Sequence, residues 1–166
     1  MAVSIEIEGL DRLIRQLSPE LIAKPLRHFF ERAAITIQNR AREKAPVDTG
    51  RLRSSIAYEL DKRPVTLWAK IGTNVAYAPY MEYGTGLFAE GPGGRGGRHF
   101  PPSGALDVWA SRHGFSSGAQ VAQIIGRRGG LRPRRYLRNA FRESAAGIQS
   151  LLVRLQREIR EGWDKR

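Results

Sequence analysis

Residues 19–44 read PELIAKPLRHFFERAAITIQNRAREK, and this stretch decides the fold. Its apolar side chains recur every three or four positions, which is the period of one face of an α-helix. They are Ile22, Leu26, Phe29, Phe30, Ala33, Ala34, Ile37 and Ala41. Pro25 either starts the helix or kinks it. Pro46 ends it, because the residue before a proline avoids the α region. A long amphipathic helix ending near Lys44 is therefore predicted.

Alternating side chains predict a small antiparallel sheet packed on this helix. Residues 3–7, 56–60 and 65–71 each alternate apolar and polar positions, which is typical of a strand with one buried face. The turn sequence DKRP at 61–64 joins the last two strands in a hairpin. In that hairpin Thr66, Trp68 and Lys70 are expected to face away from the core.

The C-terminal region predicts a second long helix, from about 135 to 162. Its apolar stripe consists of Leu137, Ala140, Phe141, Ile148, Leu151, Leu152, Leu155, Ile159 and Trp163. Shorter helices are expected at 10–17, at 51–54, at 79–83, from Ser103 to Arg112, and after Ser116 or Ser117, with Ser18 as a further cap before Pro19. The fold class is therefore α+β: a small antiparallel sheet against long N-terminal and C-terminal helices, with a loop-rich helical insertion.

The 166 residues favour one domain, 1–166, with a Gly/Arg-rich insertion at about 87–132. The net charge of +12 is uneven, because residues 91–142 contain ten arginines and a single acidic residue, Asp107. The candidate residues facing DNA or an acidic partner are Arg95, Arg98, Arg127, Arg128, Arg132 and Arg134. Such a positive field points to a polyanion or an acidic protein surface, although a solvated basic loop is the simpler alternative.

The tripeptide Asp48-Thr49-Gly50 is shared with aspartic proteases. In those enzymes two carboxylates share a proton, and the loop follows an apolar strand. Here the preceding residues finish a helix, so Asp48 or Thr49 is expected to be a structural cap that accepts a backbone N–H.

An aromatic run at 77–83 is the candidate subunit interface, formed by Tyr77, Tyr80, Met81, Glu82 and Tyr83. Aromatic residues and Met are enriched at subunit contacts. A base-stacking platform and packing beneath the loop are the alternatives.

The sequence lacks the residues and motifs of most catalytic and metal-binding sites. The chain has no Cys, and none of its three histidines is spaced from another as a metal ligand. No phosphate-binding loop or nucleophile elbow is present. We therefore expect no metal and no cofactor. No stretch is long and apolar enough to span a membrane, and no secretory signal is seen.

Three segments in order resemble the tail-component family of long-tailed bacteriophages, also called neck or tail-completion proteins. They are APVDTGRLRSSI at 45–56, NVAYAPYMEYGTG at 74–86 and RPRRYLRNAF at 132–141. The segments PPSGALDVWASRHG and AQVAQIIGRRG resemble the insertion of longer members. The resemblance extends over roughly residues 5–160. Two departures are Arg135-Tyr136, where the family usually has a pair such as Pro-Phe, and the Gly/Arg-rich stretch at 91–98.

The resemblance implies a structural virion protein with no catalytic activity, made in the host cytoplasm and located at the head–tail junction. It implies self-assembly into a ring, commonly six-fold, whose bore passes the genome. The implied partners are neighbouring neck, tail-terminator or tail-tube proteins, with non-specific contact to packaged DNA as an option for the arginines. The alternative from another class is a basic nucleic-acid-binding protein that uses the arginines of 91–142 directly.

Overall fold

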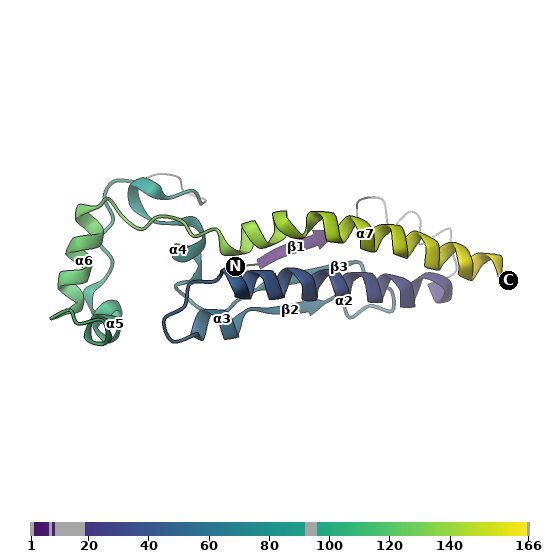
Figure 1. Ribbon diagram of the computed structural model, residues 1–166, viewed down its shortest axis with the longest axis horizontal. Helices are drawn as coiled ribbons and strands as arrows, with labels where there is room; N and C mark the ends of the chain where they lie inside the picture. The colour runs from purple at the N-terminus through teal and green to yellow at the C-terminus, as the bar shows by residue number, and fades with distance from the viewer. Residues whose placement is uncertain (1, 7, 9–18, 92–95, 166) are drawn as a thin grey trace. The chain divides into compact units, whose positions relative to one another are not determined.

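The chain has two long helices, several short helices and a three-stranded sheet (Figure 1). The computed structural model describes residues 2–6, 8, 19–91 and 96–165. Its elements are β1 (Ala2–Glu6), α2 (Pro19–Lys44), α3 (Arg51–Ser55), β2 (Ala57–Leu60), β3 (Trp68–Gly72), α4 (Ala78–Tyr83), the 3-10 helices η1 (Gly86–Phe88) and η2 (Ser103–Leu106), α5 (Asp107–Arg112), α6 (Gly118–Arg127) and α7 (Tyr136–Asp164). The predicted α+β class is confirmed. The helix expected at 10–17 and its cap Ser18 lie outside the described residues.

The elements form two compact units. Unit 1 combines Met1–Val75 with Tyr136–Arg166, and unit 2 is the intervening Ala76–Arg135. Unit 2 is wider than the insertion predicted at 87–132, because it also takes in α4 and the segment after it. Whether the whole chain unfolds as one domain stays a prediction.

Helix α2 supplies most of the core of unit 1. Every residue of its predicted stripe, from Ile22 to Ala41, is buried. The helix starts at Pro19 and runs through Pro25, so Pro25 is not the start. Pro19 occupies the first turn, where its missing N–H has no partner to lose.

Helix α7 packs against α2 in the opposite direction (Figure 1). Near the end of α2, Lys44 Nζ lies 2.6 Å from the Glu143 carboxylate of α7. Near its start, Leu21 lies against Gly162 of α7. Leu137, Ala140 and Leu155 of the predicted stripe are buried, and burying a leucine side chain stabilises by roughly 1.5–3 kcal/mol.

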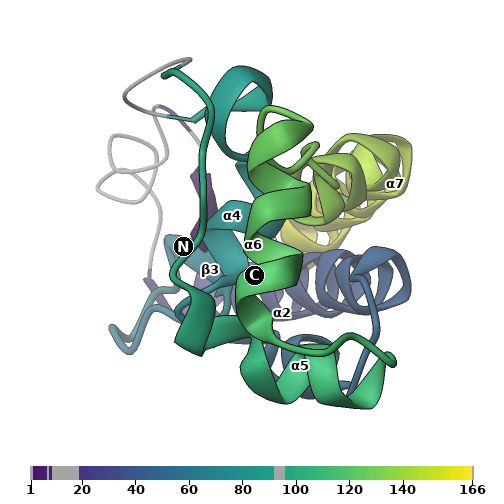
Figure 2. The same ribbon diagram turned by 90° about the vertical axis from the view of Figure 1, so that its left-hand side faces the viewer.

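The sheet has the order β1-β3-β2 with both pairs antiparallel. Ala69 and Ile71 of the central strand are buried, and α2 packs against β2 and β3. Viewed along the helices, unit 1 shows β3 on one side of α2 (Figure 2). The predicted hairpin between β2 and β3 is confirmed.

The start of the second hairpin strand was predicted wrongly. The strand begins at Trp68 instead of Val65, and Thr66 is buried instead of facing outward. The cause is the buried carboxylate of Asp61, which accepts hydrogen bonds from the Arg63 and Leu67 backbone N–H groups and from Arg63 Nε at 2.7 Å. These bonds fold residues 61–67 into a turn and remove them from the ladder.

Replacing Ser144 by alanine is expected to stabilise unit 1. The Ser144 side chain is fully buried on α7, and its Oγ has no hydrogen-bond partner among the described residues. A hydroxyl buried without a partner costs about 1–3 kcal/mol, and alanine favours the helix. Ser144→Ala should raise the free energy of unfolding by about 1 kcal/mol, measured by urea denaturation. Ser150→Ala, at an exposed site of α7, is the control; a less stable Ser144→Ala protein would contradict the assignment.

The Asp61 turn predicts a loss of stability in acid. The side-chain hydrogen bond from Arg63 is the main reason that the pKa of Asp61 lies below its usual value, while burial acts in the opposite direction. The carboxylate therefore stabilises the fold fully above about pH 4, the unfolded value, and this contribution disappears as the pH falls through the lower folded-state pKa. Asp61→Asn should lower the urea midpoint at pH 7 and match the wild type more closely near pH 2. Glu59→Gln, at an exposed position of β2, should leave the midpoint at pH 7 unchanged.

Candidate functional site

Residues 85–87 and 129–131 are far apart in the sequence and are joined by hydrogen bonds in unit 2. This pairing is called the frame of unit 2 here. The Thr85 backbone N–H donates to the Leu131 carbonyl at 2.9 Å, and the Leu87 N–H donates to the Gly129 carbonyl at 2.8 Å. The Leu131 N–H donates in return to Thr85 Oγ1 at 2.9 Å. The segment EYGTG at 82–86 and the segment RRGGLR at 127–132, which the sequence left apart, thus hold each other in place.

Glycines allow this close approach of the two backbones. Gly86 and Gly130 both have positive φ, 62° and 131°, where side chains are disfavoured. A Cβ atom on Gly86 would lie 2.1 Å from the Gly129 carbonyl oxygen, and one on Gly130 would lie 2.2 Å from that of Thr85. No larger residue fits either position without moving the frame.

The end of α4 is tied to the same segment. The Arg134 N–H donates to the Met81 carbonyl at 2.7 Å, and the Arg135 N–H donates to that of Glu82. The Arg135 guanidinium binds the Glu90 carboxylate through both Nε and Nη2. This hydrogen bond and the charge of Glu90 raise the pKa of Arg135. The Arg135 side chain therefore has a structural role, because it joins the end of this segment to Glu90.

The predicted interface residues divide by exposure. Tyr77 and Tyr80 are 41% and 53% exposed, and Met81 and Tyr83 are half-buried. Glu82 is only 2% exposed, so its side chain is not available at the surface. Of the five residues, Tyr77 and Tyr80 are the ones exposed enough to form a contact surface.

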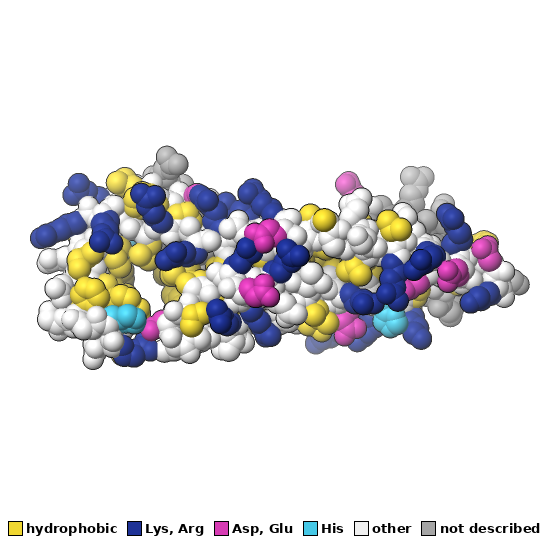
Figure 3. Space-filling model, in the orientation of Figure 1, with side chains coloured by type: hydrophobic (Ala, Val, Ile, Leu, Met, Phe, Trp, Pro, Cys, Tyr) yellow, Lys and Arg dark blue, Asp and Glu magenta, His cyan; other side chains and the backbone are white. Residues whose placement is uncertain are grey.

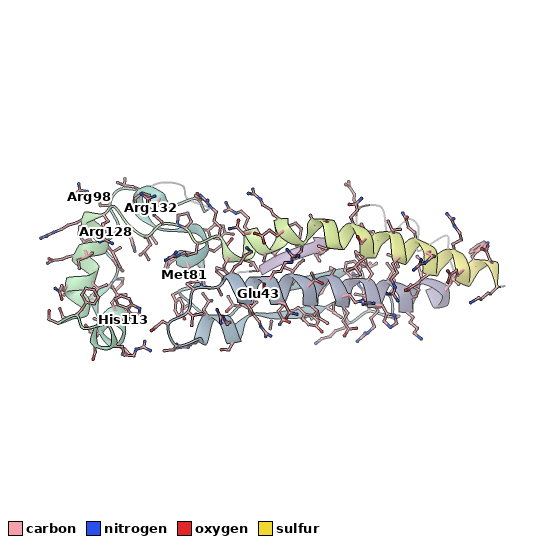
Figure 4. The ribbon with its side chains drawn as sticks, viewed as in Figure 1. Glu43, Met81, Arg98, His113, Arg128 and Arg132 are labelled. Carbon is pink, nitrogen blue, oxygen red and sulfur yellow. The ribbon has the colours of Figure 1, made fainter. Side chains whose placement is uncertain are left out.

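The predicted arginines lie exposed on unit 2. Arg98, Arg127, Arg128, Arg132 and Arg134 are all exposed, and none forms an ion pair with another described residue. Arg95 lies outside the described residues. Figure 4 shows Arg98, Arg128 and Arg132 together on one side of unit 2, with His113 away from them. Arg132 lies over the Phe88 ring at 4.9 Å.

Helix α6 carries two of these arginines at its end, and its start is well capped. Ser117 Oγ accepts from the Gln120 N–H, as predicted for Ser116 or Ser117. Asp107 Oδ1 accepts from the Gly118 N–H at 2.8 Å. The helix expected from Ser103 is divided into η2 and α5, and Pro102, not Ser103, is the first cap. The role of Asp107 was not predicted; its one signal in the sequence is that it is the only acidic residue at 91–142.

The D-T-G segment at 48–50 belongs to a helix start. Gly50, with φ of 81°, occupies the N-cap position of α3 and has no side chain to cap with. Thr49 Oγ1 accepts from the Arg51 N–H at 3.4 Å. A capping role for the Asp48 carboxylate stays a prediction.

The described part of unit 1 has a hollow of about 360 Å³ between α2 and α7. Its lining mixes apolar side chains with charged ones such as Arg154, whose Nε lies 2.8 Å from Glu158. Among the residues with described positions, no three His, Asp or Glu side chains gather as metal ligands. None of the described helices could cross a membrane.

Comparison with known proteins gives one family. Residues 10–84 match the family described as "Bacteriophage HK97-gp10, putative tail-component". The resemblance to phage tail components is thereby confirmed over the part of the chain that contains α2, the β2–β3 hairpin and α4. The match supports a structural role in a phage tail, and so a place in the virion. Neither the curated proteins nor the solved structures give a match.

Gly130→Ala is expected to open the frame of unit 2. The new Cβ would be placed against the Thr85 carbonyl, and positive φ adds strain of about 1–3 kcal/mol. Hydrogen exchange of the Leu87 and Leu131 amides, which cross the frame, should therefore become faster. Gly97→Ala is the control, since a Cβ there meets nothing within 4 Å. Equal protection in both variants would show that the frame does not depend on this glycine.

Proposed function

We propose that the protein assembles as a ring, of six subunits, at the phage head–tail junction. The observation that carries this proposal is the match of residues 10–84 to phage tail components. Contacts between different surfaces that close on rotation give rings, and such a contact needs an exposed surface on each side. In this proposal the genome passes through the bore, and neighbouring neck, tail-terminator or tail-tube proteins are the partners.

The exposed tyrosines supply the contact between subunits. Tyr77 and Tyr80 are large amphipathic side chains that half emerge from unit 2. Tyrosine is enriched at protein interfaces because its ring buries area and its hydroxyl stays bonded to water or partner. The buried Glu82 takes no part in this contact.

Changing Tyr77→Ser and Tyr80→Ser together should prevent ring formation and tail joining. The fold should survive, because both side chains are already exposed, and exposed sites tolerate substitution within about 0.5 kcal/mol. Negative-stain images and light scattering measure the ring, and circular dichroism checks the helices. Val153→Ser, at an exposed site of α7, is the control. Rings of unchanged size in the double variant would refute this contact, and loss of helical signal would place the tyrosines in the core.

A basic nucleic-acid-binding protein is the second candidate function, favoured by the five exposed, unpaired arginines. In a ring around the genome, the arginines would contact phosphates only, so affinity for DNA would fall log-linearly with salt and show no sequence preference. A dedicated nucleic-acid-binding protein would instead bind one sequence tightly. The test is a salt titration against a random duplex, with wild type and with Arg127, Arg128, Arg132 and Arg134 changed to Gln. Absence of binding at about 50 mM salt removes this candidate, whereas tight binding to one sequence favours it over the ring.

A further inference from the structure

Two large apolar side chains are exposed near the arginines that form no ion pair with another described residue. Leu87 is 49% exposed and lies against Gly129, while Phe100 is 55% exposed and its ring lies against Gly126 at the end of α6. Leu87, Phe100, Arg98, Arg128 and Arg132 are called the Arg–apolar patch here. In Figure 3 hydrophobic side chains (yellow) lie among Arg side chains (dark blue) over this unit.

The members of the patch are neighbours through the frame of unit 2. Leu87 is bonded through its backbone N–H to Gly129, next to Arg128. The backbone of His99, between Arg98 and Phe100, lies close to Gly86. Arg132 is held over the Phe88 ring, beside Leu87. The backbone hydrogen bond of Leu87 and the Arg132–Phe88 contact hold part of the patch in place before any partner binds, which lowers the entropy cost of binding.

The composition of the patch is that of a protein interface. Unit 2 has eight arginines and no lysine. Interface cores are enriched in arginine and aromatic residues and depleted of lysine, and binding hot spots follow the same preference. Apolar groups rimmed by polar ones mark protein contacts. A surface that only follows DNA phosphates gains little from half-exposed Leu87 and Phe100.

The charge of the patch excludes a like partner. Unit 2 has only three acidic residues, and of these Glu82 is buried, Glu90 binds Arg135, and Asp107 binds the start of α6. A second copy of this surface would repel the first. The complementary partner must bring carboxylates for the arginine forks, together with an apolar site for Phe100.

We propose that the Arg–apolar patch docks on an acidic surface of a different protein, with Phe100 as the apolar anchor and Arg98, Arg128 and Arg132 bound to carboxylates. This inference rests on the proposed function, because the partner is a neighbouring component of the particle. It is separate from the tyrosine contact between subunits.

The test is photo-crosslinking inside assembled particles. Phage carrying Phe100→p-benzoylphenylalanine is irradiated, and the adduct is identified by mass spectrometry. An adduct with a different virion protein, at an acidic segment, is expected. Because Phe100 packs on Gly126, Arg128→p-benzoylphenylalanine provides a second probe that leaves this contact intact. Val108→p-benzoylphenylalanine, at an exposed site of α5, is the matched control and should not give this adduct.

Each other outcome overturns the inference. An adduct with DNA assigns the patch to the genome, and an adduct with a second copy of this chain assigns it to the ring. No adduct from either probe in particles that contain the protein, or an adduct at a basic segment, also refutes the docking. Absence of the protein from purified particles would instead refute the proposed function.

Lysine substitution tests whether the partner is bound by the guanidinium forks or by positive charge alone. The triple change Arg98→Lys, Arg128→Lys and Arg132→Lys keeps the charge but removes the planar forks. Tail joining in an extract should fall at least about tenfold, as for loss of hot-spot residues. Arg142→Lys, at an exposed site of α7, is the control. Joining unchanged by the triple substitution would show that charge alone is read, and would overturn the proposed carboxylate contacts.

Discussion

Helices α2 and α7 bury their apolar stripes against each other, and the rest of unit 1 depends on this contact. The sheet has three short strands, too few residues to form a core alone, and it packs on α2 through Ala69 and Ile71. The charges at Lys44 and Glu143 align one end of the helix pair. The Oγ atom of Ser144, next to Glu143, is buried and has no hydrogen-bond partner among the described residues. The contact between the helices is therefore held by shape and apolar area more than by polar bonds.

The long elements were predictable because their determinants are local. A stripe repeated over 26 residues in α2 and one over 29 residues in α7 outweigh the single irregularity of Pro25. The alternation that predicted the strands failed at 65–67, where pattern and structure are set by different residues. There Asp61 draws three donors to its carboxylate, and a side chain that reorganises a turn leaves no mark in hydrophobic periodicity.

The candidate site was predictable in composition but not in arrangement. The arginine count and the tyrosines were visible in the sequence, and the exposure of five arginines agrees with a charged surface. That Glu82 is buried, and that Leu87 and Phe100 are exposed beside the arginines, follows from the pairing of Thr85 with Leu131, 46 residues apart. Contacts at that separation are set by tertiary packing and have no local signal. The glycines at 84, 86, 129 and 130 make this pairing possible, because all four have positive φ, a conformation that glycine adopts without strain.

The division of unit 1 into two stretches has a consequence for synthesis. Helix α7 lies in the last 31 residues, and the 60 residues of unit 2 precede it. Domains fold as the chain leaves the ribosome, N-terminal parts first where they are complete. Here the order is reversed: α2 emerges early and has only the sheet to pack on, while the contiguous unit 2 has all its residues before α7 exists. During synthesis, unit 2 can therefore finish folding before unit 1 does. Helix α2 packs against α7 only after residues 136–166 have been made.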